Sequence, residues 1–157
     1  MRYACQLWGQ VENANTRRVL VLQKCALRLM SSSHPRTPSR PLFRYFEILT
    51  IFDLVKLLNI LLVHQHLNSL LPSDLCSTLV FKRIDHSYPT RRQNLGLLKL
   101  PYANTTTHGL KRLSSQAILQ WNSFLKFCPQ LADLPLNRVK TIAKSFFITH
   151  YLSLIHI

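Results

Sequence analysis

One segment of the chain combines residue types that bind a polyanion. Within residues 82–94 the residues of interest are Lys82, Arg83, Tyr88, Arg91 and Arg92. Arginine can bind phosphate oxygens through two parallel hydrogen bonds, and a tyrosine ring can stack on an unpaired base. We therefore interpret this segment as a basic loop that contacts nucleic acid, with Lys111 and Arg112 adding charge if their segment folds back beside it. The alternative is a structural clasp, with Tyr88 in the core and an arginine bonded to a loop carbonyl, and the two roles can be divided between residues.

The acidic side chains have no arrangement that suits catalysis. A polymerase needs clustered carboxylates that hold two metal ions about 3.5–4 Å apart. The acidic residues are instead isolated along the chain: Glu12, Glu47, Asp53, Asp74, Asp85 and Asp133. The neighbours His86 and Ser87 lack the strand–turn–helix setting of a nucleophile. We therefore expect no catalytic residue, and we expect that this chain alone is not an enzyme.

The histidines and cysteines predict neither a metal site nor a cofactor. His64 and His66 would point about 200° apart on a helix, which is a poor geometry for chelation. The four cysteines, at positions 5, 25, 76 and 128, include no pair at the spacing of a zinc site. The N-terminal MRYACQLWGQ lacks the apolar core of a secretory signal. We therefore expect reduced thiols and a cytoplasmic or nuclear location.

The charge of the chain predicts the kind of partner. Twenty Lys and Arg against 6 Asp and Glu give a formal net charge of +14, and such a surface attracts polyanions in a salt-dependent way. RNA or DNA, bound without sequence preference, is the partner that we expect. The longest apolar run, Ile48–Leu71, contains several polar and charged residues that would be costly in lipid. No membrane partner is therefore expected.

Two helices and a linker are predicted in the first 41 residues. One helix lies within Tyr3–Gln10 and ends near Gly9, and a second spans Arg17–Met30. Helical spacing gives the second helix one apolar face. That face consists of Val19, Leu22, Ala26 and Leu29. Residues 31–41 are rich in proline and serine and have no periodicity, which predicts an extended linker.

The most clearly signalled helix begins after Thr50. Thr50 and Asp53 have the spacing of a capping box, and Leu49 with Leu54 can form a hydrophobic staple. Pro72 is expected to end the helix together with Ser73. The predicted apolar face consists of Ile51, Leu54, Val55, Leu58, Leu61 and Leu62. The residues expected off that face are Asp53, Lys56 and Asn59.

The second half of the chain predicts a hairpin and two more helices. Leu95–Leu100 and His108–Leu113 flank an Asn- and Thr-rich turn and are expected to pair as a β-hairpin. A helix then begins at Ser114 or at the serine after it and ends at Phe124. Its inward residues are Ala117, Ile118 and Trp121. The last helix is expected at Asn137–Tyr151, so the predicted fold class is mainly α, a small helical domain with one short β-hairpin.

Five segments of the chain, taken in order, carry a resemblance to a known family. They are LQKCALRLM (Leu22–Met30), PLFRYFEILTIFDLVKLLNILL (Pro41–Leu62), HSYPTRR (His86–Arg92), LLKLPYANTTTHGLKRLSSQAILQWNSF (Leu97–Phe124) and RVKTIAKSFFITHYL (Arg138–Leu152). This ordered set resembles the C-terminal region of a non-LTR (LINE-type, jockey-like) retrotransposon reverse transcriptase, downstream of the polymerase palm. No single segment is specific, but the resemblance covers nearly the whole chain, from Tyr3 to about Tyr151.

The resemblance implies a role without chemistry for this chain. The parent polyprotein would be an RNA-directed DNA polymerase, but the family's catalytic Tyr-x-Asp-Asp turn does not occur here. The chain would then help to bind template RNA or target DNA, and its other partner would be the remainder of the polyprotein. One alternative is a helical interaction or scaffold module without a nucleic-acid role. Another is a nonfunctional retroelement remnant.

The resemblance and the linker together predict how the chain is divided. Residues 1–30 would be a helical remnant of the reverse-transcriptase thumb region, and 31–41 the linker. Residues 42–151 would form the C-terminal helical domain, with the basic loop and the hairpin. The last six residues, LSLIHI (152–157), back-translate to CTG TCT CTT ATA CAC ATC, which resembles a sequencing adapter. We expect an assembly artefact there, with a genuine apolar tail as the alternative.

Overall fold

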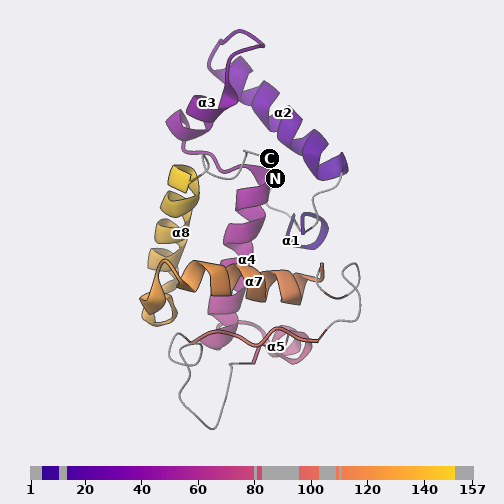
Figure 1. The fold of residues 1–157 in the computed structure, drawn as a ribbon, viewed down its shortest axis with the longest axis vertical. Coiled ribbons are helices and arrows are strands. Elements are labelled where there is room, and N and C mark those ends of the chain that lie inside the picture. The colour runs from indigo at the N-terminus through magenta and orange to yellow at the C-terminus, as the bar shows by residue number, and fades with distance from the viewer. Residues whose placement is uncertain are drawn as a thin grey trace.

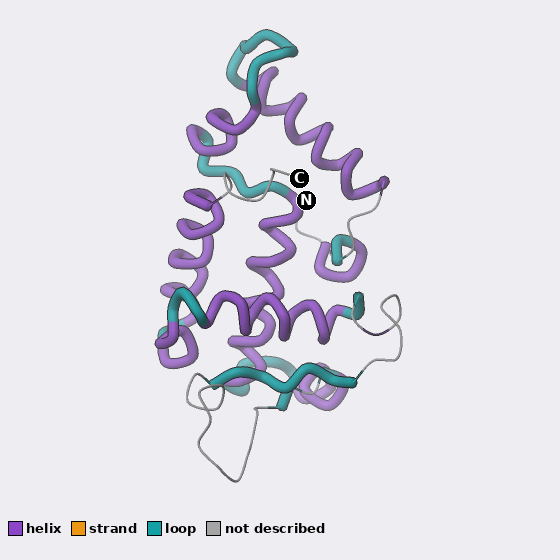
Figure 2. Tube along the Cα trace, viewed as in Figure 1, coloured by secondary structure: helices purple, strands orange, loops and turns teal. Residues whose placement is uncertain are grey.

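The computed structural model describes residues 5–10, 14–79, 81–82, 96–102, 109 and 111–150. Its helices are α1 (Cys5–Trp8), α2 (Ala14–Met30), α3 (Ser39–Tyr45), α4 (Ile51–Leu67), α5 (Ser73–Thr78), α7 (Leu113–Leu125), the short 3-10 helix η2 (Pro129–Asp133) and α8 (Leu136–His150). The predicted mainly α class is confirmed, and Figure 2 shows helices and loops throughout the described part. No helix among these residues has the length and apolarity needed to span a lipid bilayer.

Helix α4 lies at the centre of the molecule. In Figure 1, α7 crosses it, α8 runs beside it, and α2 with α3 covers its N-terminal end. Its buried residues are Ile51, Asp53, Val55, Leu57, Asn59, Ile60, Leu62, Val63 and His64. The prediction of a single apolar face with Asp53 and Asn59 outside it was therefore wrong. The reason is that α1, α2, α7 and α8 pack on α4 from several sides, so its buried residues are not confined to one face.

The largest cluster of core residues joins α4, α7 and α8. Trp121 and Ala117 of α7 are both fully buried, and Ile118 is 1% exposed, so the predicted inward face of this helix is confirmed. Leu57 and Ile60 of α4 belong to the same cluster. Burying a side chain of this size contributes roughly 1.5–3 kcal/mol. This contact between α4 and α7 therefore makes a large contribution to the stability of the fold.

Buried amide groups tie α4 to two other segments. The Asn59 side chain is fully buried. Its Oδ1 accepts from Nε2 of Gln10 at 2.9 Å, and its Nδ2 donates to Oε1 of Gln10 at 2.9 Å and to Oε1 of Gln120 at 2.8 Å. Gln10 follows α1 and Gln120 belongs to α7. The Asn59 amide therefore links α4 to α7 and to the segment after α1, which are distant from each other in the sequence.

The predicted cap of α4 is confirmed. Oγ1 of Thr50 accepts a hydrogen bond from the Asp53 backbone N–H at 3.2 Å, and it donates to Oδ2 of Asp53 at 2.8 Å. Oδ1 of Asp53 accepts from Nζ of Lys56 at 3.2 Å. A residue from α2 completes the cap, because Oε1 of Gln23 accepts from the Ile51 N–H at 2.9 Å. The start of α4 thus depends on both local and distant partners.

The inward face of α2 differs from the prediction. Its buried residues are Thr16 and Leu27, whereas Leu22 is 61% and Leu29 is 80% exposed. The helix is oriented by Gln23, whose amide bonds the first turn of α4 and the Leu49 carbonyl oxygen. This contact turns the face containing Gln23 toward α4. Of the predicted apolar face, Val19 packs against the core, whereas Leu22, Ala26 and Leu29 are exposed.

Three helices end on a left-handed residue that is not glycine. Ser32, Glu47 and Ser69 have φ values of 51°, 49° and 55°. After α4, the Ser69 N–H donates to the His66 carbonyl and the Leu70 N–H donates to the Gln65 carbonyl, which is the Schellman pattern. The helix therefore ends at Leu67, and the prediction that it continues to Pro72 and Ser73 was wrong.

The linker and the hairpin are also different from what was predicted. Helix α3 begins at Ser39, inside the predicted linker 31–41. The described residues of the two predicted hairpin strands do not pair with each other: Leu113 begins α7, and Leu98 is bonded to the Asn122 side chain. Leu95, His108 and Leu110 of the predicted strands lie outside the described residues, and within the described part the Asn122 side chain takes the two backbone groups of Leu98.

We predict that the Thr50 cap stabilises the protein measurably. Thr50→Ala removes the acceptor for the Asp53 N–H and is expected to cost about 0.5–2 kcal/mol, seen as a lower midpoint in urea unfolding. Thr141→Ala is the control, because Thr141 is exposed within α8 and its loss should change stability by about 0.5 kcal/mol or less. Equal midpoints for the two variants would contradict the capping role.

A second prediction concerns the end of α4. Ser69→Gly relieves the left-handed backbone of Ser69 and is expected to raise the free energy of unfolding by roughly 0.5–1 kcal/mol. The matched control is Ser145→Gly, at an exposed position inside α8, which should lower it by about 0.5–1 kcal/mol. Urea unfolding should therefore show a gain in the free energy of unfolding for Ser69→Gly and a loss for Ser145→Gly. A loss in both variants would show that the backbone of Ser69 is not strained.

Candidate nucleic-acid interface

The structure describes three of the seven residues that the sequence singled out for nucleic-acid binding. Lys82, Lys111 and Arg112 are all exposed. The other four lie outside the described residues: Arg83, Tyr88, Arg91 and Arg92. The candidate site is therefore built here from Lys82, Lys111, Arg112 and their described neighbours.

Lys82 lies beside a second lysine. The Lys99 backbone N–H donates to the Lys82 carbonyl oxygen at 2.7 Å, and both side chains are exposed. Sequence reasoning missed Lys99. The signal was present in the pattern of Leu98, Lys99 and Leu100, since alternation of apolar and charged residues in an extended segment puts the charge on the outer side.

The segment that carries Lys99 is fixed by one side chain of α7. Oδ1 of Asn122 accepts from the Leu98 N–H at 2.9 Å, and Nδ2 of Asn122 donates to the Leu98 carbonyl at 2.8 Å. The Leu98 side chain is 1% exposed and belongs to the main core. Asn122 thus bonds both groups of one peptide residue as a neighbouring strand would, and it holds Lys99 at a constant place on the surface.

Lys111 and Arg112 lie at the start of α7. Arg112 is the N-cap residue, with φ −65° and ψ 150°, and its side chain makes no capping hydrogen bond. The N-terminus of a helix carries the positive end of the helix dipole. The positive charge of these two residues and that of the helix dipole are therefore concentrated at the same end of α7.

The clamped segment runs back toward that end of α7. Asn122 lies nine residues after Leu113, which is about 14 Å along the helix axis. Four residues of extended chain, from Leu98 to Tyr102, reach about 13 Å. In Figure 1, the 96–102 segment lies against α7 and its later end is on the side where α7 begins. We call Lys82, Lys99, Lys111 and Arg112 the basic surface.

The acidic residues that form ion pairs lie elsewhere. Asp53 pairs with Lys56 at 3.2 Å within α4, and Glu47 pairs with Lys144 at 3.6 Å. Neither of these pairs, in the part of the chain described, includes a residue of the basic surface. Its four cationic side chains are exposed in a protein whose formal net charge is +14, so their field is directed outward to solvent.

His64, His66 and Cys5 have packing roles. Nε2 of His64 lies 2.8 Å from the Leu134 carbonyl oxygen, and the His66 ring lies edge-on to Phe81 with centroids 4.9 Å apart. Burial raises the pKa of the Cys5 thiol, which keeps it protonated and unreactive. Within the residues that the structure describes, no group of three or more His, Cys, Asp or Glu side chains is arranged to hold a metal ion.

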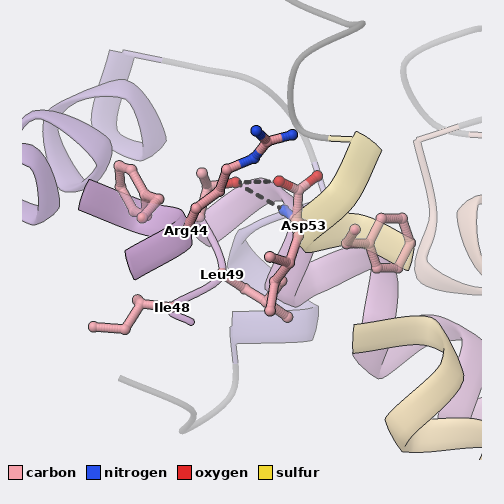
Figure 3. Close-up of a pocket in the computed structure, with 8 residues that line it drawn as sticks. Arg44, Ile48, Leu49 and Asp53 are labelled. Carbon is pink, nitrogen blue, oxygen red and sulfur yellow. Dashed lines mark hydrogen bonds between the residues drawn. The ribbon is translucent and has the colours of Figure 1, made fainter. Parts of the chain in front are cut away.

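A small hollow lies between α3, the start of α4 and α8. It is lined by Phe43, Arg44, Ile48, Leu49, Thr50, Asp53, Phe147 and Ile148 (Figure 3). Its polar groups are already bonded: Nη2 of Arg44 donates to the Thr149 carbonyl at 3.2 Å, and Asp53 binds Thr50 and Lys56. Because these polar groups already have partners within the protein, this hollow is not the candidate site.

Comparisons with known proteins add no relative to this description. The chain was compared with protein-family models, with curated protein sequences and with solved structures, and none of the three gave a match.

Proposed function

We propose that this chain is the noncatalytic, basic C-terminal region of a LINE-type reverse transcriptase, and that it helps to bind template RNA or target DNA through the phosphate backbone. The family assignment rests on the resemblance of the five ordered segments, and the observation that carries the nucleic-acid role is the basic surface. Lys82 and Lys99 are joined backbone to backbone, and Asn122 holds the Lys99 segment against the core. Lys111 and Arg112 add charge where α7 begins.

The chemistry of the basic surface favours phosphate over base edges. Lysine is a compact charge on a flexible stem that suits a phosphate oxygen, and phosphate contacts carry no sequence information. Binding through such contacts releases condensed counterions and is therefore weakened by salt. The partner that fits is a nucleic acid bound without sequence preference.

A second candidate function is supported by α2. This helix exposes four large apolar side chains, with exposed fractions of 56% for Val21, 61% for Leu22, 80% for Leu29 and 62% for Met30. Apolar residues gathered on one helix are typical of a surface that contacts another protein. A helical interaction module, which would dock on the remainder of a polyprotein, is the alternative that this observation favours.

Salt dependence tests the first proposal. The double variant Lys82→Ala, Lys99→Ala keeps the backbone hydrogen bond between the two residues and removes two cationic groups. Loss of two phosphate contacts should lower the slope of log affinity against log salt by about 1.4 for a single strand. Fluorescence anisotropy with a labelled oligonucleotide over a salt series measures that slope, and circular dichroism checks the fold.

The charge-matched control is Arg138→Ala, Lys140→Ala on α8, where both residues are exposed. This variant loses the same net charge, and its salt slope should stay close to that of the unchanged chain. If the slope of log affinity against log salt falls equally in the two double variants, binding depends on the net charge of the protein and not on a defined basic surface. Absence of binding by the unchanged chain at low salt would leave the interaction module as the better proposal.

A further inference from the structure

Tyr102 is an aromatic residue that takes almost no part in the fold. Its side chain is 94% exposed, whereas Phe81 and Phe124 are 7% and 3% exposed. Two other exposed aromatic residues lie against rings of the protein: Tyr45 is 5.1 Å from Phe46, and Phe127 is 4.9 Å from Phe146, between centroids. No such ring contact is formed by Tyr102 with the residues that the structure describes, so both faces of its ring remain open to a ligand.

The segment before Tyr102 is held rigidly on the protein. Leu97 and Leu98 are buried, and Asn122 bonds both backbone groups of Leu98. Pro101 precedes the tyrosine and fixes its own φ, and it restricts the residue before it to extended conformations. Tyr102 therefore follows a short segment whose backbone has little conformational freedom. Binding a ligand there should cost the protein little backbone entropy.

Two lysines lie on the segment that carries this ring and on the segment bonded to it. Lys99 lies three residues before Tyr102, and Lys82 is hydrogen-bonded to Lys99 through the backbone. The segment ends on the side of the molecule where α7 begins. Lys111 and Arg112 directly precede α7 in the sequence. A flat apolar ring beside cationic side chains matches a nucleotide, which has a flat base and an anionic phosphate.

We propose that Tyr102, Lys82 and Lys99 form a binding site for single-stranded nucleic acid. Tyr102 stacks on an unpaired base, and the two lysines bind the phosphates on one side of it. A duplex does not offer a free base face, because its bases are already stacked on each other. This site therefore selects single strands over duplexes, and it deepens the proposed function, on which it rests.

An acidic protein segment is the other partner that a basic and aromatic surface could bind. It would use the lysines in the same way, but it would gain nothing specific from a ring that is open on both faces. The openness of Tyr102 therefore favours the base-stacking partner, and competition decides between the two. Poly-glutamate is the acidic probe, and oligouridylate is the single-stranded probe.

The test compares Tyr102→Ala with Tyr45→Ala in the full chain. Tyr45 is 81% exposed on α3 and is the matched control. Affinity is measured for oligouridylate and for a DNA duplex of equal length. Tyr102→Ala should lower the ratio of single-strand to duplex affinity by roughly 5- to 150-fold, and Tyr102→Phe should restore it. Tyr45→Ala should leave the ratio unchanged.

The possible outcomes separate this inference from the proposed function. Because Tyr102→Ala removes no charge, the salt slope should stay the same while the affinity ratio falls. An unchanged ratio would overturn the stacking site and would leave phosphate binding intact. The stacking site would also be overturned if poly-glutamate, at equal charge concentration, displaced oligouridylate from the unchanged chain as readily as from the Tyr102→Ala variant. If the unchanged chain binds neither nucleic acid, the proposed function fails together with the site.

Discussion

The rest of the structure depends on the way in which α1, α2, α7 and α8 enclose α4. A polar side chain that this packing buries loses its contact with water, and a partner inside the protein offsets that loss. Asn59 finds partners in Gln10 and Gln120, and His64 lies against the carbonyl oxygen of Leu134. These partners come from different segments. The polar groups of α4 therefore determine which segments pack around it and at what level along its axis.

The sequence predicted those features of the fold that short-range signals specify. The capping of α4 by Thr50 involves a residue three positions away, and the inward face of α7 repeats at helical spacing. The face of α2 was predicted wrongly, because the residue that orients this helix is the polar Gln23, whose partner lies 28 residues along the chain. The end of α4 was also missed, because Ser69 adopts a backbone conformation that is usually taken by glycine.

The candidate site was predicted only in part for a similar reason. Lys82, Lys111 and Arg112 can be identified from residue type and position in the sequence, because this step requires no knowledge of the fold. Lys99 and Tyr102 become meaningful only when the 96–102 segment is placed, and that placement depends on Asn122, 24 residues from Leu98. A single amide at long range leaves no periodic signal. Sequence reasoning noticed the neighbouring Trp121 instead, because a large apolar ring at helical spacing is easily recognised as core.

The Asn122 clamp also has a consequence for self-association. An extended segment on a protein surface offers unpaired N–H and C=O groups, and a second molecule can add a strand to them and begin aggregation. At Leu98 both backbone groups are bonded to Asn122, and the next N–H, that of Lys99, is bonded to Lys82. An incoming strand would find these groups occupied and two lysines beside them. The segment can thus remain extended and solvent-facing without acting as a template for β-aggregation.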